Sequence, residues 1–290
     1  MKLKENITQK KLRGGYYTPQ KLANYITKIT LKDKMKILEP SCGDGSFLKS
    51  IKNILDNSDY SVEKIDAIEY IEEEANKSKK ILKDIDCASV INDDFYNFYI
   101  NCKKKYNLII GNPPYIRYQY LEENQRILMS EILVSQGMKS NRLVNTWVGF
   151  MVACVNLLSD NGKIAFVIPA EILQVAYAED LRLFLANHLS KITLITFEEL
   201  VFPDIEQEIV VFIGEKGTEE KGIRIIELNN LDDLNDFDID TNGFQKLQHV
   251  HEKWTKYFTN NKENELISKI RKDNRFQMLS DTALINVGIT

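Results

Sequence analysis

The chain has 290 residues, of which 43% are hydrophobic and 28% charged, which predicts one large globular domain with part of a second. It contains no run of about 18 apolar residues and no apolar signal core at the N-terminus, which argues against a membrane-spanning or exported protein and predicts a cytoplasmic location. The net charge of −4 argues against a protein that binds a phosphate backbone by itself, so any nucleic-acid contact must use a local patch or a part not present here.

The cysteines and histidines do not predict a metal site. The four cysteines are far apart in apolar or helical contexts, with no C-x-x-C pair and no nearby histidine cluster, which favours free buried thiols. His249 and His251 are two residues apart and cannot share one helix face. The cysteines are Cys42, Cys87, Cys102 and Cys154.

The N-terminal region predicts an arm followed by a helix. Residues 1–13 are basic and polar without periodicity, so we expect a frayed or loosely docked arm. Thr18 is then expected to be the N-cap residue, with Pro19 in the first helical position of a helix that runs to about Thr30. Read alone, this is a capped surface helix.

A strand, a glycine turn and a helix come next. The strand Lys36–Pro40 runs into a turn that contains Gly43 and Gly45, and an amphipathic helix follows. This order is typical of the first unit of a nucleotide-binding α/β fold, in which glycines let the backbone approach a ligand closely. Because the third glycine of the dinucleotide motif is absent, the pattern favours an uncharged or zwitterionic nucleoside over a pyrophosphate.

Two further strands are predicted to deliver polar groups to the same edge. Lys64–Glu69 ends on a carboxylate about 25 residues after the glycine turn, where a carboxylate can accept both ribose hydroxyls. Ala88–Asn92 is followed by Asp94 and Phe95. An acceptor beside an aromatic ring suits an adenine, although a strand-end turn with a core phenylalanine is an equally good interpretation of this segment alone.

A rigid polar tip follows the fourth strand, Tyr106–Gly111. The tip is Asn112-Pro113-Pro114-Tyr115. Its two prolines fix φ, remove two backbone donors and hold Asn112 outside the helical region. The amide of Asn112 is therefore presented in one orientation beside free carbonyls, which is suited to hold an amino group.

The remaining pattern predicts a seven-stranded, mostly parallel, doubly wound α/β sheet with an antiparallel hairpin at one edge. The hairpin is expected because no helix separates the last two strands. The further strands expected are Lys163–Pro169, Lys191–Phe197 and Glu208–Gly214, and the further helices are Tyr120–Val134, Asn141–Leu158 and Ala178–Leu189, the second of them ending at Asp160-Asn161-Gly162.

Beyond Lys216 the character of the sequence changes. Leu231–Asp240 is acidic and is expected to run along the surface, and residues 244–272 are expected to be helical. Ile285–Thr290 is interpreted as the start of a strand that belongs to a further domain. We therefore expect an N-terminal arm at 1–13, a catalytic domain at 14–222, and a linker and helical region at 223–290 that leads into a truncated domain.

Taken together, these motifs resemble the class I methyltransferases that use S-adenosylmethionine, and specifically the N6-adenine DNA methyltransferases in which the cofactor motif precedes the catalytic one. The resemblance covers roughly residues 14–216. It is carried by Tyr17-Thr18-Pro19, Leu38-Glu39-Pro40 with Gly43 and Gly45, Glu69, Asp94-Phe95, Asn112-Pro113-Pro114-Tyr115 and Val201-Phe202-Pro203.

The resemblance implies S-adenosylmethionine as cofactor, S-adenosylhomocysteine as product and no metal. It also implies that Thr18 and Glu39 hold the methionine end, Glu69 the ribose, and Asp94 with Phe95 the adenine. The implied catalytic residues are Asn112, Pro113, Pro114 and Tyr115, with Tyr115 and Phe202 stacking on a flipped-out base. The full implied cofactor set is Tyr17, Thr18, Pro19, Glu39, Pro40, Ser41, Cys42, Gly43, Gly45, Glu69, Tyr70, Asp94, Phe95 and Asn112.

The implied partner is double-stranded DNA. The resemblance also implies a restriction-modification system, in which an endonuclease is fused to the methyltransferase or is a separate protein. Val287-Gly288-Ile289-Thr290 resembles the opening of the family's target-recognition domain, the rest of which is missing from this chain. A methyltransferase of the same fold acting on RNA or on a protein glutamine stays open, because the tip can hold any planar amide or amine. A cofactor-binding subunit without turnover would need a broken motif, and every motif is intact.

Overall fold

The computed structural model describes residues 17–140, 143–202, 207–235, 237–239, 243–247, 253–259, 261–277 and 279–283. Its chain divides into two compact units, Met1–Trp254 and Thr255–Thr290. The second unit contains the helices α9 (Asn261–Lys272) and α10 (Leu279–Thr282). The architecture that follows is that of the first unit.

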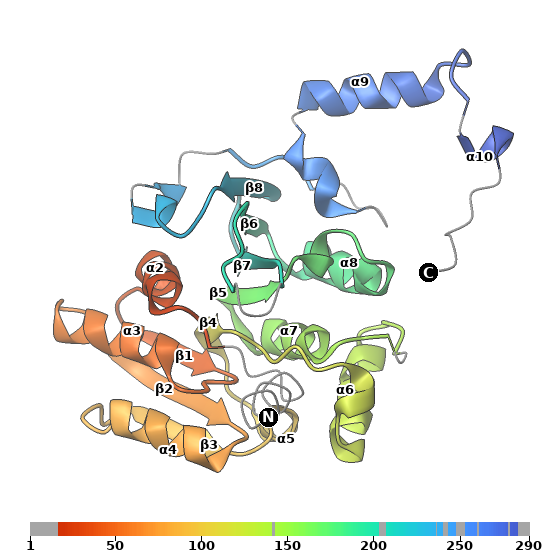
Figure 1. Cartoon of the computed structure of the whole chain (residues 1–290). Coiled ribbons are helices and arrows are strands. Elements are labelled where there is room, and N and C mark those ends of the chain that lie inside the picture. Colours follow the sequence, from red (N-terminus) through yellow and green to blue (C-terminus); the bar gives the residue numbers. More distant parts are fainter. Residues whose placement is uncertain are drawn as a thin grey trace, which may run out of the picture. The chain divides into compact units, whose positions relative to one another are not determined.

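One eight-stranded sheet forms the centre of the first unit, with the strand order β3-β2-β1-β4-β5-β7-β6-β8 (Figure 1). Neighbouring strands from β3 to β5 are parallel, β7 is antiparallel to both β5 and β6, and β8 is parallel to β6. The strands are β1 (Met35–Glu39), β2 (Val62–Glu69), β3 (Ala88–Asn92), β4 (Tyr106–Gly111), β5 (Leu158–Pro169), β6 (Lys191–Phe197), β7 (Ile209–Glu215) and β8 (Gly222–Leu228).

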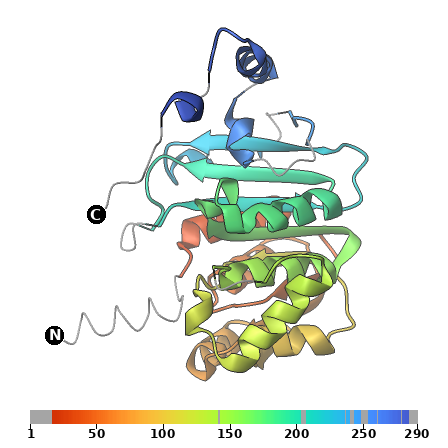
Figure 2. The same cartoon turned by 90° about the vertical axis from the view of Figure 1, so that its right-hand side faces the viewer.

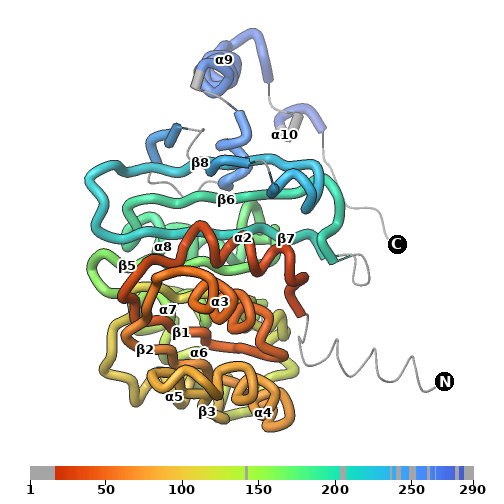
Figure 3. The backbone as a smooth tube through the Cα atoms, turned by 90° about the vertical axis from the view of Figure 1, so that its left-hand side faces the viewer, coloured from red at the N-terminus to blue at the C-terminus, as the bar shows by residue number. Residues whose placement is uncertain are grey.

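Helices cover both faces of this sheet. The helices α2 and α3 pack together on the face seen in Figure 3, and α6, α7 and α8 lie on the opposite face, which is turned to the viewer in Figure 2. The helices of this unit are α2 (Gln20–Thr30), α3 (Ser46–Asp56), α4 (Glu72–Ile81), α5 (Phe95–Asn101), α6 (Glu123–Ser135), α7 (Thr146–Leu157) and α8 (Glu179–His188). None of the helices in the described part of the chain is long and apolar enough to cross a membrane.

The prediction of a doubly wound, mostly parallel α/β sheet is confirmed, and so is the antiparallel pairing of β6 with β7. The predicted number of seven strands is wrong, because Gly222–Leu228 forms an eighth strand beside β6. The sheet therefore continues past residue 222, where the sequence pattern placed the end of the domain. The hairpin is also not a simple edge, because β7 inserts between β5 and β6.

Several element ends differ from the prediction. The N-cap of α2 is Pro19 rather than Thr18, whose side chain is buried. The helix predicted from Asn141 begins at Thr146 and ends at Leu157. Residues 160–162, which were expected to end that helix, belong to β5, because this strand starts at Leu158 and pairs with β4.

The acidic stretch after β8 is anchored by its apolar residues. Leu234 is buried, and Leu231, Phe237 and Ile239 pack against the core cluster, while Asp232 forms an exposed ion pair with Lys21. The stretch thus follows the surface as predicted, but its apolar side chains point inward. Further on, Gln245 pairs with Ile223 of β8 in an antiparallel bridge, so the predicted helix does not start at residue 244. Residues 1–13, His249, His251 and Ile285–Thr290 lie outside the described residues.

A glycine lets the helices behind the site pack closely. The Tyr96 hydroxyl, on α5, donates to the Thr146 carbonyl at the start of α7 over 3.1 Å. A Cβ placed on Gly149 of α7 would lie 2.5 Å from that hydroxyl oxygen and 2.6 Å from Cγ of Met129 on α6. Because Tyr96 is almost fully buried, its ring cannot move away without disturbing the packing of all three helices.

We expect Gly149→Ala to lower the free energy of unfolding by about 1–2 kcal/mol, because overpacking outweighs the gain of about 1 kcal/mol in helix propensity. Urea denaturation followed by circular dichroism measures this. The control is Gly243→Ala, where an added Cβ meets no atom of the described residues within 4 Å and stability should stay within about 0.5 kcal/mol of the parent. A Gly149→Ala protein as stable as the parent would contradict the close packing.

Candidate active site

The glycine turn joins β1 to α3 and is bonded to the end of β2. The Gly43 N–H donates to Oε2 of Glu69 over 2.8 Å, and the Cys42 N–H donates to the Ile68 carbonyl over 2.9 Å. Gly43 has φ of +50° and Gly45, the N-cap of α3, has φ of +82°, a region that residues with a Cβ adopt only with strain. The turn therefore needs glycine at both positions, as the motif indicates.

The Glu69 carboxylate is held at both oxygens. Besides the bond from Gly43, its Oε1 accepts the Ile71 N–H over 2.8 Å. Burial raises the pKa of Glu69, and the backbone N–H groups of Ile71 and Gly43 act in the opposite direction. Each carboxylate oxygen can accept more than one hydrogen bond, so the group is oriented and retains acceptor capacity.

Glu39, at the end of β1, is a buried acid. Its side chain is 1% exposed, and Oε2 accepts no hydrogen bond from the described residues. Its pKa is raised well above the usual value, first by burial and then by the negative charges of Glu69 and Asp44. A buried carboxyl oxygen without a donor is unfavourable, and this position suits a ligand that brings an N–H group or a positive charge.

A small pocket opens where these elements meet. It combines the residues before α2, the glycine turn and the first residue after β4. It is lined by Tyr17, Thr18, Glu39, Ser41, Cys42, Gly43, Asp44, Ser46, Phe47 and Asn112. Half of the predicted cofactor residues are absent from this lining, namely Pro19, Pro40, Gly45, Glu69, Tyr70, Asp94 and Phe95. Pro19 caps α2, and Pro40 lies against Gly111.

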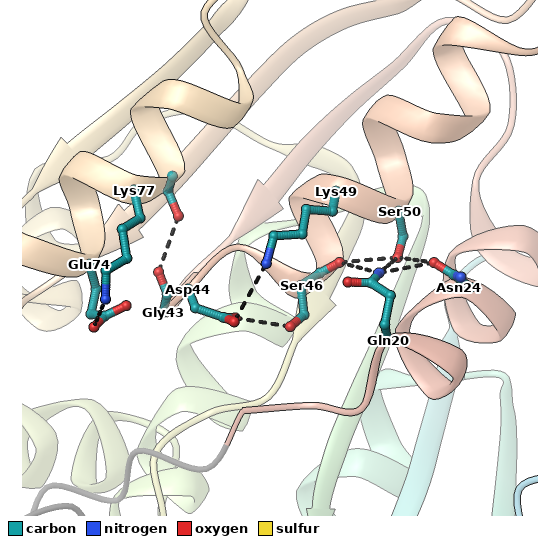
Figure 4. A network of polar contacts seen from close by, with 10 residues as sticks. Gln20, Asn24, Gly43, Asp44, Ser46, Lys49, Ser50, Glu74 and Lys77 are labelled. Atoms are coloured by element: carbon teal, nitrogen blue, oxygen red, sulfur yellow. Dashed lines mark hydrogen bonds and ion pairs between the residues drawn. The ribbon is translucent and has the colours of Figure 1, made fainter.

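Polar contacts behind the turn connect α2, α3 and α4 (Figure 4). On α2, Gln20 donates to the Ser46 carbonyl and to the Ser50 hydroxyl at 3.0 and 2.8 Å. Asp44 accepts from the Ser46 hydroxyl at 2.9 Å and pairs with Lys49 at 3.5 Å. The turn is thus supported by three helices, so its backbone is held in place before any ligand binds.

The tip that follows β4 is fastened at both ends. The Ser41 hydroxyl donates to the Asn112 carbonyl over 3.2 Å. The Ile116 carbonyl accepts from both the N–H and the hydroxyl of Thr146, at 3.0 and 2.8 Å. Between them, the Tyr115 hydroxyl donates to the Val167 carbonyl of β5 over 3.0 Å. Asn112 therefore lies beside the glycine turn on a segment that the structure holds in one conformation.

Asp94 and Phe95 lie at the start of α5. Asp94 is the N-cap of this helix, and its Oδ1 accepts from the N–H groups of Tyr96 and Asn97. Phe95 is 3% exposed and packs on Phe150 with 4.5 Å between ring centroids. The ring is thus mainly part of the core, which was the alternative interpretation of this segment.

The remaining predicted residues lie around this edge. Tyr70 is exposed and donates to Glu122 over 2.7 Å, a bond that raises its pKa. Phe202 is 8% exposed, and Tyr115 packs against the apolar cluster to which Phe202 belongs. Pro203 is outside the described residues.

The sequence pattern did not single out Gln125, which donates to Oδ2 of Asp94 over 2.6 Å. The spacing from Glu122 to Gln125 is that of a capping box, which indicates a helix start but gives no sign of a contact with Asp94. In the part of the chain that the structure describes, no cluster of three or more metal-ligating side chains occurs.

Strand order, glycine turn and fastened tip define the class I methyltransferase fold, and known structures agree. A protein described as a class I S-adenosylmethionine-dependent methyltransferase from Listeria monocytogenes superposes with a TM-score of 0.60 at 13% identity, covering 75% of this chain and 67% of that one. The structure of a DrdV–DNA complex superposes with a TM-score of 0.67 at 12% identity, covering 84% of this chain and 31% of that one.

The chain belongs to the Eco57I restriction-modification methylase family, which it matches over residues 9–202. The type II methyltransferase M.HincII of Haemophilus influenzae is 30% identical over 79% of this chain and 42% of its own length. M.AccI of Acinetobacter calcoaceticus is 26% identical over 80% of this chain and 41% of its own length. The chain thus spans about two fifths of the length of these relatives, and the resemblance to restriction-modification methyltransferases is confirmed.

We expect Glu39→Gln to raise the free energy of unfolding of the ligand-free protein by about 1–3 kcal/mol at pH 8, because it removes a buried acid that lacks a donor. The pKa of Glu39 is raised in the folded state. The contribution of the protonated Glu39 side chain to stability is therefore complete below the unfolded pKa of about 4.3, and it is lost as the pH rises through the folded pKa. The gain from the substitution should therefore grow between pH 5 and pH 8, in urea titrations.

The matched control is Glu63→Gln, an exposed acid on the neighbouring strand β2, which should change stability by less than about 0.5 kcal/mol at either pH. A Glu39→Gln protein that is less stable than the parent at pH 8 would mean that the ionised carboxylate is satisfied in the fold.

Proposed function

We propose that this chain transfers a methyl group from S-adenosylmethionine to the exocyclic amino group of an adenine in DNA, as the methyltransferase part of a restriction-modification system. The observation that carries the proposal is the hydrogen bond from Ser41 to the Asn112 carbonyl. It places the tip that suits an amino group directly beside the glycine turn that suits a nucleoside cofactor, in a chain of this methylase family.

The residues around the turn fit S-adenosylmethionine. Glu39, together with Thr18, offers a buried acceptor oxygen that no described residue donates to, and this oxygen would bind the ammonium at the methionine end. A Cβ on Gly43 would take up space beside Tyr17 at the pocket lining. Glycine at this position leaves that space for a ligand. Glu69, oriented by two backbone N–H groups, would accept from the ribose hydroxyls. When bound, the cofactor supplies an electrophilic methyl group on a sulfonium.

The tip would activate the amine without a covalent intermediate. The lone pair of the adenine amine is delocalised into the ring, which makes it a poor nucleophile. Hydrogen bonds from the amine to the Asn112 side-chain oxygen and the Pro113 carbonyl would draw the nitrogen toward tetrahedral geometry and localise its lone pair. The rate would come from positioning two reactants in line and from stabilising charge that develops only in the transition state.

An adenine inside a duplex cannot reach this site, so it must be flipped out. Tyr115, with Phe202 from the same apolar cluster, would stack on the flipped base, and stacking on an aromatic ring contributes about 1–3 kcal/mol per base. Because Phe202 is nearly buried in the free protein, we expect the Val201–Phe202 segment to shift when a base enters. Tyr115 is only half-buried and needs less movement.

The proposed partner is double-stranded DNA, supported by the structures with which the fold superposes, among them a DrdV–DNA complex. The choice of target would depend on a C-terminal recognition domain, because the chain spans only part of its relatives' length. We also propose association with a fused or separate endonuclease and a location in the cytoplasm, where the DNA of a restriction-modification host lies.

We expect Asn112→Ala to lower methyl transfer at least about 100-fold, because the amine loses its oriented acceptor. Transfer of tritium from labelled S-adenosylmethionine to DNA measures this. The matched control is Asn101→Ala, an exposed asparagine on α5 whose side chain donates to the Asn97 carbonyl of its own helix, and it should transfer at the parent rate. Unchanged transfer in Asn112→Ala would overturn the mechanism.

Competition among double-stranded DNA, RNA and a glutamine-containing protein as acceptors tests the substrate class. We expect label to appear in DNA, on adenine. Label in RNA or on a protein glutamine would show that the same site serves the alternative substrate. Because residues 1–290 span about two fifths of the relatives, we expect weak DNA binding without sequence preference from this chain alone.

A further inference from the structure

Gln125 forms a hydrogen bond with Asp94, the residue predicted to hold the adenine of the cofactor. Gln125 lies in the first turn of α6, and its side-chain Nε2 donates to Oδ2 of Asp94 over 2.6 Å. Its Oε1 accepts the Glu122 N–H over 3.1 Å, as part of the capping box of α6. The Asp94 carboxylate can only accept and so binds the amide nitrogen, and the Glu122 N–H can only donate and so binds the amide oxygen. The orientation of Gln125 is therefore determined by its contacts.

The hydrogen bonds of Asp94 leave one acceptor position. A carboxylate has about four lone-pair sites, two on each oxygen. Oδ1 uses its sites for the N–H groups of Tyr96 and Asn97, at 2.8 and 3.3 Å. Oδ2 uses one site for Gln125. Within the described residues, Asp94 can thus accept one further hydrogen bond, at a defined place on Oδ2.

Two other contacts hold the first turn of α6 at this edge. Tyr70, directly after β2, donates to Glu122 over 2.7 Å, and Asn124 donates to the side chain of Asn97 over 3.4 Å. The helix follows the tip after one short connection, in which Tyr118–Tyr120 forms a single 3₁₀ turn. The first turn of α6, which carries Gln125, is therefore held by contacts to the end of β2 and to α5.

We infer that Gln125 is a positioning residue for the adenine end of the cofactor site, an inference that rests on the proposed function. By occupying one site on Oδ2, it keeps the carboxylate from rotating toward solvent and leaves a single acceptor that matches one N–H of the adenine amino group. A hypoxanthine, which carries a carbonyl oxygen at the same position, has no proton to donate there and would face a lone pair. Gln125 thus supports selection of an adenosyl ligand.

The sharpest variant is Gln125→Glu. It keeps an oxygen that can accept the Glu122 N–H, so the capping box survives, but it removes the amide donor to Asp94. Gln125→Leu removes both side-chain contacts and shows the effect of losing the side-chain half of the capping box. The matched control is Asn124→Ala, on the same turn, which loses only the 3.4 Å contact to Asn97.

Isothermal titration calorimetry with S-adenosylhomocysteine and with its deaminated analogue, S-inosylhomocysteine, provides the readout. We expect the parent to bind the adenosyl ligand at least about tenfold more tightly, the effect of one well-placed hydrogen bond to a charged group. In Gln125→Glu and Gln125→Leu at pH 8, affinity for S-adenosylhomocysteine should fall about tenfold and the preference should fall below about threefold. Asn124→Ala should bind S-adenosylhomocysteine with the affinity of the parent and with the same preference over S-inosylhomocysteine.

Lowering the pH gives a second, independent test. The carboxyl introduced by Gln125→Glu would face Asp94, and two adjacent carboxyls take up a proton more readily than one. The protonated group can donate to Asp94 as the amide does, so from pH 8 to pH 6 the preference for the adenosyl ligand should recover relative to the parent. The other titratable groups at this edge, Asp93, Glu122 and Tyr70, are common to both proteins, and Gln125→Leu should not recover.

The outcomes separate the inference from the proposed function. If the parent does not bind S-adenosylhomocysteine, the proposed function fails. If the parent binds it and Gln125→Glu keeps the full preference for the adenosyl ligand, the function stands and the role of Gln125 is refuted. A uniform loss of affinity for both ligands, with the preference unchanged, also refutes it, because that is the result of a purely structural role.

Discussion

The hydrogen bond between the Gly43 N–H and the Glu69 carboxylate connects the ends of β1 and β2, and the candidate site depends on it. It orients the carboxylate and secures the glycine turn, while α2, α3 and α4 support the turn from behind. Ser41, in the same turn, then bonds to Asn112 after β4. One short segment thus aligns three parallel strands, and parallel strands present their carboxyl ends at one edge of the sheet.

The same edge carries groups that do not help the chain to fold. Glu39 is buried, no described residue donates to one of its oxygens, and its raised pKa reflects burial together with the charges of Glu69 and Asp44. Burial of like charges is unfavourable unless a ligand compensates it. Elsewhere, a large cluster of buried apolar side chains packs against the sheet. The apolar core therefore stabilises the fold, and the carboxyl edge of the sheet holds buried acids whose ionisation is unfavourable without a ligand. Groups with shifted pKa values are common at functional sites.

Much of the site could be predicted because its residues lie at strand ends in a fixed order. The two glycines, Glu69 and the tip from Asn112 to Tyr115 all lie where the pattern placed them, since each follows a short apolar run that can only be a buried strand. The prediction failed where local propensity was the only guide. Thr18 was expected to cap α2, yet Pro19 is the N-cap, because Thr18 is buried at the pocket. The sequence pattern does not predict Gly222–Leu228 as a strand, although its pairing with β6 makes it an eighth strand.

The amino-acid sequence by itself determined the doubly wound α/β class, the left-handed glycines of the turn and the rigidity of the tip, because these follow from hydrophobic periodicity and from the φ preferences of glycine and proline. Only the tertiary structure decided which distant groups meet. Gln125 bonds to Asp94, Thr146 fastens Ile116, and Phe95 packs into the core on Phe150. These contacts join residues from separate elements, and their formation depends on how helices pack on the sheet, which no local pattern records.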